Sequence, residues 1–379
     1  MSAISSPAYW FSREEFLARI ARIQAGLRAQ RLDGLVAFMP ETVTWATGYF
    51  TRAYGTLQFA IIPADGEPTL FARDVEAYYL DTTCVFADRV LWADSDDRMK
   101  LAAGAIARRF GPAARLGIEL QAWPLSAGRH AYLQAALPGY VWQDESDLVA
   151  RMRLIKSPAE LAYQRKAATA AEAGMRAAIA TAAAGVSERE MAAEICAAMI
   201  RAGSDLPGPG VLSSGERAFH LHGGYSDRVL APGDLVQIET TPNVRHYHAR
   251  FMRPIRVGPV TDEDFRTVEH LIAIQDEALR AVAPGVAATV PDAIYRNGVL
   301  RAGLRETYTN KTFYSVGLIL QPNGGEPLEA TPASDWAFEV GQTFHTYVLA
   351  KGFGMSETIT ITETGHERLT RFPRQLFVA

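Results

Sequence analysis

Gly233-Asp-Leu-Val-Gln-Ile-Glu239 is one of two segments that decide the fold of this chain, and the other is Gly341-Gln-Thr-Phe-His-Thr-Tyr347. Each begins with a glycine turn and continues as an alternating segment that predicts a β-strand. Two helical stretches precede each segment, so the order helix, helix, strands occurs twice at a period of roughly a hundred residues. The repeat predicts two α+β halves around one pocket. The sixth residue after each glycine is expected to point into that pocket: Glu239 in one half and Tyr347 in the other.

Length and composition exclude several classes of protein. The chain has 379 residues, of which 48% are hydrophobic and 21% charged, as expected for an ordinary globular protein with two domains. The net charge of −4 does not indicate the basic surface that nucleic-acid binding needs. No apolar run reaches transmembrane length, and Met1–Pro7 has no signal-peptide pattern. We therefore expect a cytoplasmic protein with no nucleic-acid or membrane partner.

A helix-capping signal marks the expected domain boundary. Ser157-Pro-Ala-Glu160 combines an N-cap, a proline at the first helical position and a glutamate at the third. Before it, amphipathic helices alternate with short strands such as Leu35-Val-Ala-Phe-Met39, and a hairpin is expected around Ala64-Asp-Gly-Glu67. We expect an α/β domain with a mixed sheet over residues 1–155 and an α+β domain over residues 156–379.

Several motifs together resemble the creatinase/prolidase family, whose C-terminal domain has the pita-bread fold. They are Lys156-Ser-Pro-Ala-Glu160, Pro232-Gly-Asp234, Tyr247-His-Ala-Arg250, Tyr314-Ser-Val-Gly317, Thr343-Phe-His345 and Ser356-Glu-Thr-Ile-Thr-Ile-Thr-Glu-Thr-Gly365. The motifs cover most of the chain, and their combination is specific although no single one is. The resemblance implies a creatinase-type N-terminal domain and a pita-bread catalytic domain with an internal pseudo-twofold duplication.

The metallopeptidases of this family bind two metal ions with two Asp, one His and two Glu. Carried over by position, these ligands fall on Glu239, Arg250, Tyr314, Tyr347 and Ser356. Two divalent cations need several anionic oxygens or imidazoles, and a guanidinium repels them. We therefore expect no metal and no other cofactor.

The chain is most similar to the metal-free branch of the family, which includes creatinase and the ectoine hydrolases. The order of Tyr314-Ser-Val-Gly317, Gly325-Glu-Pro327, Thr343-Phe-His345 and Met355-Ser-Glu-Thr358 especially resembles ectoine hydrolase. Both relatives hydrolyse C–N bonds in small charged nitrogen compounds without a metal. The resemblance thus implies a metal-independent hydrolase of an ectoine-like or creatine-like amidine, guanidine or amide.

The same resemblance implies catalytic roles. Glu239 is expected to act as the nucleophile or the base. His222 falls where creatinase has its catalytic histidine and could pass a proton to the leaving nitrogen. Both His220 and His222 also fit loop histidines that only hydrogen-bond the backbone. Alternation is expected to put both on one side of an extended chain, and position favours His222 as the functional one. His345 and Glu357 are expected to face the pocket, where Glu357 would neutralise a cationic substrate and His345 would hold a carboxylate or share the proton. A buried network that braces the strands is the alternative for both.

Further residues are expected to bind the substrate. Arg250 could recognise a carboxylate bidentately, and Arg253 matches an arginine of the family's second strand. Tyr314 and Tyr347 are expected to close the vacated metal site, by binding substrate or by packing. Met252 replaces a functional carboxylate of creatinase, which indicates a rebuilt pocket floor.

The segment Gly48-Tyr-Phe-Thr-Arg52-Ala-Tyr54 lies where the family has an N-terminal loop. In family dimers this loop reaches the partner's pocket, so the resemblance implies a homodimer in which Arg52 and Tyr54 contact the substrate of the second chain. An aromatic surface loop without that role is the alternative. Two other functions stay open: a metal-dependent Xaa-Pro aminopeptidase and a non-catalytic pita-bread protein that binds a peptide.

Overall fold

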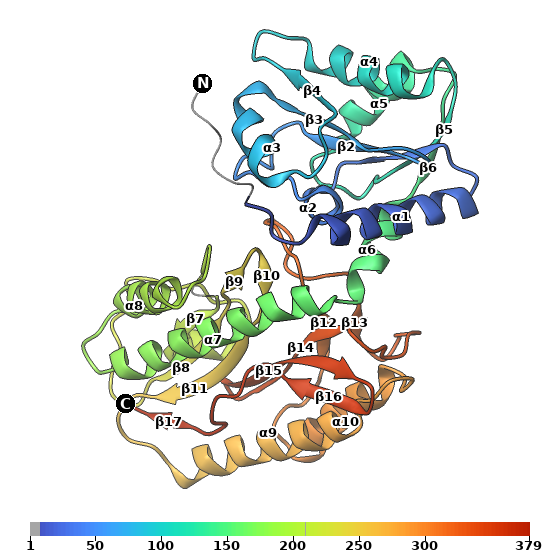
Figure 1. The fold of residues 1–379 in the computed structure, drawn as a ribbon. Helices are drawn as coiled ribbons and strands as arrows, with labels where there is room; N and C mark the ends of the chain where they lie inside the picture. Colours follow the sequence, from blue (N-terminus) through green and yellow to red (C-terminus); the bar gives the residue numbers. More distant parts are fainter. Residues whose placement is uncertain (1–7, 209) are drawn as a thin grey trace. The chain divides into compact units, whose positions relative to one another are not determined.

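A computed structural model describes residues 8–208 and 210–379 of the chain (Figure 1). The chain divides into two compact units, Met1–Arg153 and Leu154–Ala379. The sequence places this boundary two residues later, between residues 155 and 156. Met1–Pro7, in which the sequence has no signal-peptide pattern, lies outside the described residues. Among the described residues, no helix combines the length and the apolar character needed to cross a membrane.

The N-terminal unit is built around one mixed sheet of six strands, in the order β4-β3-β2-β1-β5-β6. Strand β1 pairs antiparallel with β2 and parallel with β5. The strands are β1 (Gly34–Ala37), β2 (Phe59–Pro63), β3 (Thr69–Arg73), β4 (Arg89–Trp92), β5 (Arg115–Ile118) and β6 (Val141–Asp144). The expected hairpin joins β2 to β3, and the expected α/β class with a mixed sheet is confirmed.

Helices cover both faces of this sheet, with α1 and α2 on one side and α4 and α5 on the other (Figure 1). The helices are α1 (Arg13–Ala29), α2 (Pro40–Thr47), α3 (Ala77–Thr83), α4 (Arg98–Phe110), α5 (Ala127–Ala136) and α6 (Ser146–Leu154), with a 3-10 turn η1 (Asp74–Glu76). Helix α1 begins where Ser12 accepts a hydrogen bond from the Glu15 backbone N–H, as its capping motif predicts. Apolar side chains of the sheet and of α4 and α5 form one buried core.

The C-terminal unit repeats one arrangement. Its first half contains α7 (Pro158–Thr181), α8 (Glu188–Arg201), β7 (Leu212–Ser214), η2 (Gly215–Phe219), β8 (Leu235–Thr240), β9 (Asn243–Val244), β10 (Tyr247–His248) and β11 (Phe251–Arg256). Its second half contains α9 (Asp262–Arg280), α10 (Thr289–Arg301), β12 (Phe313–Ser315), β13 (Glu329–Ala330), β14 (Thr343–Ala350), β15 (Phe353–Thr362), β16 (Gly365–Arg368) and β17 (Phe377–Val378). The sheet orders are β17-β11-β8-β7 and β13-β12-β14-β15-β16. In Figure 1, α7 and α9 lie on opposite sides of these strands.

The two halves correspond strand by strand. Gly233 and Gly341 both have a left-handed backbone, with φ of +90° and +88°, which glycine adopts without the steric cost of a Cβ. Glu239 and Tyr347 are each the fifth residue of the following strand, β8 or β14. Where the halves meet, the Met252 backbone N–H donates to Ser356 Oγ at 2.7 Å, which joins β11 to β15. The expected pita-bread fold with an internal duplication is confirmed.

Candidate active site

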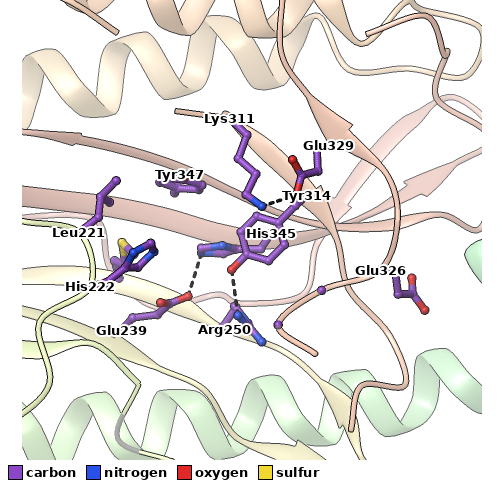
Figure 2. A pocket seen from close by; sticks show the side chains of 13 residues that line it. Leu221, His222, Glu239, Arg250, Lys311, Tyr314, Glu326, Glu329, His345 and Tyr347 are labelled. Atoms are coloured by element: carbon purple, nitrogen blue, oxygen red, sulfur yellow. Dashed lines mark hydrogen bonds and ion pairs between the residues drawn. The ribbon is translucent and has the colours of Figure 1, made fainter. Parts of the chain in front are cut away.

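A cavity of about 390 Å³ lies between the strands of the two halves (Figure 2). Residues from both halves and from the loops beside them line it: Leu221, His222, Glu239, Arg250, Met252, Lys311, Tyr314, Gly324, Gly325, Glu326, Glu329, His345 and Tyr347. Six of the residues selected from the sequence, His222 among them, therefore meet in one cavity with Met252 and several residues that the sequence did not indicate.

Strand alternation explains why these side chains share a face. Glu239 on β8 pairs with Met252 on β11, and His345 on β14 pairs with Tyr314 on β12. Cross-strand partners point to the same side of a sheet, and residues two apart do so as well, which adds Tyr347 to the His345 face.

Glu239 is buried, and its Oε1 has no hydrogen-bond partner among the described residues. His345 Nε2 lies 3.6 Å from this oxygen, beyond hydrogen-bond range. Burial raises the pKa of Glu239, while the charges of Arg250 and His222 act to lower it. The backbone of Glu239 packs closely on Gly210, where a Cβ would lie 1.9 Å from the Glu239 backbone carbonyl oxygen. Only glycine fits at that position. The site thus holds a desolvated carboxylate with a free oxygen.

Arg250 and Tyr314 form a hydrogen-bonded pair opposite this carboxylate. Arg250 Nη1 donates to the Tyr314 hydroxyl at 2.9 Å. The Arg250 backbone is fixed to β15 by Thr358, whose Oγ1 accepts from the Arg250 N–H at 2.9 Å and donates to the Arg250 carbonyl at 2.8 Å. Burial raises the pKa of Tyr314, so its hydroxyl keeps its proton at neutral pH.

His345 provides a neutral imidazole. Burial, followed by the charges of Arg250 and Lys311, holds its pKa well below the usual value. Neither ring nitrogen has a hydrogen-bond partner among the described residues. The ring stacks on Tyr347 with centroids 5.4 Å apart and meets the edge of Tyr314 at 5.0 Å. Tyr347 is held in turn by Asn310 Nδ2, which donates to its hydroxyl at 3.2 Å.

The two loop histidines lie in different hollows. His222 lines the cavity that contains Glu239, whereas His220 lines a separate hollow with Arg305 and Lys351. The expectation that chain alternation places both on one side is therefore wrong. The segment after η2 turns between the two residues, so the spacing of an extended strand does not apply.

The expectation that Glu357 faces the pocket is wrong, and Arg253, expected to bind the substrate, does not line the cavity either. Both side chains are fully buried, and Arg253 Nη2 lies 2.7 Å from Glu357 Oε1, on the other face of the strands. Glu357 also accepts a hydrogen bond from the Thr370 hydroxyl, and Arg253 donates to the carbonyls of Ser356 and Phe372. Because Ser356 pairs with Tyr347, alternation turns the next residue away from the cavity. The pair braces the strands, as the alternative reading of Glu357 proposed.

The sequence did not indicate two ion pairs at the cavity. Lys311 Nζ pairs with Glu329 Oε1, and Lys156 Nζ pairs with Glu326 Oε2. Lys311 lies in irregular chain just before β12, where no strand period applies, and Lys156 and Glu326 are 170 residues apart. Only folding brings these charges together.

Arg52 and Tyr54 belong to the N-terminal unit. Arg52 is exposed, and Tyr54 packs against Phe50 and Trp123 with ring centroids 6.2 and 6.3 Å away. The role expected of this loop concerns the pocket of a second chain, and it stays a prediction.

The residues at the metal-ligand positions of the family do not fit two divalent cations. Arg250 places a guanidinium among them, Tyr314 is a protonated phenol, and Ser356 Oγ already accepts from the Met252 N–H. In the described part of the chain, no three His, Cys, Asp or Glu side chains converge as a metal site. The donor set lacks the several anionic oxygens that such ions need.

Comparison with known proteins places these observations in a family. Residues 162–363 match the model of metallopeptidase family M24, and residues 19–155 match the creatinase/prolidase N-terminal domain. An uncharacterized hydrolase/peptidase of Sinorhizobium fredii is 28% identical, over 97% of this chain and 98% of its own. The ectoine hydrolase of Halomonas elongata is 27% identical over the same shares. The crystal structure of a prolidase from Thermococcus sibiricus has the same fold, with a TM-score of 0.86, 24% identity and coverage of 96% and 99% of the two chains.

Both full-length relatives carry the name of a hydrolase, which supports a hydrolytic activity here. The family model covers more than half of the chain, from residue 162 to 363 of 379. This protein belongs to metallopeptidase family M24 and carries the creatinase/prolidase N-terminal domain.

Proposed function

We propose that this protein is a metal-independent hydrolase that cleaves a C–N bond in a small charged nitrogen compound. The proposal depends on Glu239, a buried carboxylate in a cavity lined largely by polar side chains. Its Oε1 has no hydrogen-bond partner among the described residues. Arg250 stands where the metallopeptidases of the family have a metal ligand. A fixed cation there supplies positive charge that a metal ion would otherwise supply.

Glu239 must be ionised to react. Burial raises the pKa of Glu239, and the nearby positive charge of Arg250 opposes that effect. Once ionised, the desolvated carboxylate serves as the nucleophile or as the base that removes a proton from water.

The leaving nitrogen needs a proton. His222 lines the same cavity from a loop and is exposed, so it exchanges protons with solvent. His345 stays neutral beside Glu239 and offers a ring nitrogen that can relay a proton. We assign the proton transfer to His222, with His345 as the neutral neighbour of Glu239.

The size of the cavity supports a small substrate. About 390 Å³ is at the lower end of the range for small-molecule sites, roughly 300–1,000 Å³. The similarity to an ectoine hydrolase over nearly the whole chain points to the same substrate class. Cleavage of an Xaa-Pro dipeptide by a metal-dependent peptidase would require ligands that this donor set lacks.

The test begins with purified protein whose metal content is measured by mass spectrometry. A panel of creatine, ectoine, N-acetyl amino acids and Xaa-Pro dipeptides is screened for thermal stabilisation, because a ligand that binds only the native state raises the melting temperature. Turnover of each ligand that binds is then measured with and without a chelator. We expect turnover of a small C–N compound that the chelator does not change. Loss of activity with the chelator and its return with manganese would contradict the proposal.

Glu239→Gln is the decisive variant, because it keeps the shape of the side chain and removes the base. We expect it to lower kcat by about four orders of magnitude, the upper part of the usual range for a general acid or base, while ligand binding persists. Glu263→Gln is the matched control, since Glu263 is an exposed glutamate of the same unit that pairs with Lys351. Wild-type turnover by Glu239→Gln would exclude this mechanism.

A further inference from the structure

Tyr314 lies between two cations in the cavity. The Arg250 guanidinium carbon is 5.5 Å from the centroid of its ring, and Lys311 Nζ is 5.0 Å from it. Arg250 also donates a hydrogen bond to the Tyr314 hydroxyl at 2.9 Å (Figure 2). Two positive charges and a donated hydrogen bond all act on this one phenol.

The hydrogen bond leaves the hydroxyl proton of Tyr314 available. The oxygen accepts from Arg250, and among the described residues no acceptor receives the proton of the hydroxyl. A phenol that accepts from a cation becomes a stronger donor, because the chain of hydrogen bonds polarises it. Tyr314 lines the cavity with Glu239, so a substrate beside the carboxylate also meets this donor.

The surrounding chain fixes both members of the pair. Thr358 holds the backbone of Arg250 on β15 through two hydrogen bonds. A Cβ at Gly325 would lie 3.0 Å from Tyr314 Cδ2, so the glycine backbone packs directly on the ring. A donor that is fixed before the substrate binds needs no reorganisation during the reaction.

We infer that Tyr314 is a catalytic residue that donates a hydrogen bond to the oxygen of a scissile amide carbonyl, with Arg250 as the positioning residue. The inference rests on the proposed function and narrows its substrate class to small amides such as N-acyl amino acids. The Arg250–Tyr314 pair would then polarise the carbonyl group, at positions where the metallopeptidases of the family place metal ligands.

The reaction balances with the groups present. Glu239 takes a proton from water, and the hydroxide oxygen bonds to the amide carbon. The π electrons of the C=O bond move to the oxygen, which the Tyr314 O–H stabilises. When the C=O bond re-forms, the C–N bond breaks and its electron pair stays on nitrogen. That nitrogen receives the proton held by Glu239, through His222, so an acid and an amine leave.

The charges favour a neutral electrophile over an amidinium or a guanidinium. A cationic carbon beside Tyr314 would face Arg250 and Lys311 at once. Glu329 is already paired with Lys311, and Glu326 with Lys156. A cation would therefore depend on Glu239, the carboxylate that has to react. A neutral carbonyl instead gains from both cations as its oxygen becomes negative.

The experiment compares Tyr314→Phe with the wild type on N-acetyl amino acids and on creatine. Loss of one such donor lowers kcat by about 10²–10³-fold, and KM is expected to change little. N-(Methylphosphonyl) amino acids mimic the tetrahedral intermediate, because a tetrahedral phosphorus replaces the carbonyl carbon. Tyr314→Phe should bind them more weakly than the wild type by a similar factor. Tyr308→Phe is the control, because this half-buried tyrosine of the same unit does not line the cavity. It should keep the wild-type kcat.

Each outcome decides one question. If Tyr314→Phe keeps near wild-type kcat and analogue affinity while Glu239→Gln is inactive, Tyr314 does not have this role. The proposed function then still stands. Turnover of creatine without turnover of any N-acetyl amino acid overturns the substrate class. Activity in Glu239→Gln overturns the proposed function itself. If Tyr314→Phe does not fold, Arg250→Lys keeps the charge and displaces the donor, and the same loss of kcat and of analogue affinity is expected.

Discussion

The two halves of Leu154–Ala379 share one backbone plan but direct different chemistry into the cavity. The central strands of the first half contribute charge through Glu239 and Arg250, whereas those of the second contribute the rings of Tyr314, His345 and Tyr347. The charged residues of the second half at the cavity, Lys311, Glu329 and Glu326, are held in ion pairs. Glu239 and Tyr347 hold the same place in their strands. The duplicated backbone thus fixes where a side chain points, while the reaction depends on which residue stands there.

The halves also differ in how they hold a buried glutamate. Glu239 in the first half has an oxygen without a partner among the described residues. Glu357 in the second half is paired with Arg253 and accepts from Thr370. The unpartnered carboxylate is suited to react, and the paired one stabilises the fold.

A large loss of activity is expected from a change in the loop of the first half. His222→Ala should lower kcat by roughly 10²–10⁴-fold, because protonation of the leaving nitrogen then depends on water. His220→Ala is the matched control, since His220 lies in a separate hollow and should leave kcat unchanged. Equal effects of the two substitutions would remove the distinction between the two histidines. Steady-state kinetics on the substrate identified in the screen measures both.

The second expected effect separates the two glutamates by stability. Glu357→Gln should lower the free energy of unfolding by about 3–5 kcal/mol, because it leaves the buried Arg253 guanidinium without its counter-charge. Glu239→Gln should cost no stability, since it removes a buried charge whose contact with His345 Nε2, at 3.6 Å, is beyond hydrogen-bond range. Urea unfolding of both variants checks this. A stability loss in Glu239→Gln as large as that in Glu357→Gln would show that the two carboxylates are equivalent.

The smallest expected effect is on pH dependence. Burial raises the pKa of Glu239 above its ordinary value of 4.5, so kcat should fall on the acid side through a pKa above 4.5. At pH values between the ordinary pKa of Glu239 and its pKa in the folded protein, the folded state binds more protons than the unfolded state. The stability that this group contributes is therefore complete below the ordinary pKa and is lost as the pH rises through the folded pKa. Glu239→Gln should therefore gain stability relative to the wild type as the pH rises above 4.5.

Urea unfolding of the wild type and of Glu239→Gln at several pH values measures this difference. The kcat profile of the wild type gives the acid limb independently. A constant stability difference between the two proteins from pH 4 to pH 8, together with an acid limb below 4.5, would contradict the raised pKa. Burial also holds the pKa of His345 well below its usual value, so its imidazole is neutral at neutral pH.

Local sequence patterns predict the helices, the strands and the duplication. Ser157, Ser187 and Thr261 each form the capping box that their local sequence indicates. Gly233 and Gly341 begin the two strands that bring Glu239 and Tyr347 to the cavity. Caps, turns and strand periods depend on residues a few positions apart, so sequence patterns carry them. Strand alternation also held the signal that Glu357, next to Ser356, faces away from the cavity.

The packing of the two halves determines which distant side chains meet. Arg250 and Tyr314 are 64 residues apart, and Lys156 and Glu326 are 170 residues apart. It also decided that His222 joins Glu239 while His220 does not. The physical reason is that hydrogen bonds and ion pairs depend on distances of about 3–4 Å. Such distances are set by how strands from both halves pack, and no local pattern of the chain encodes them.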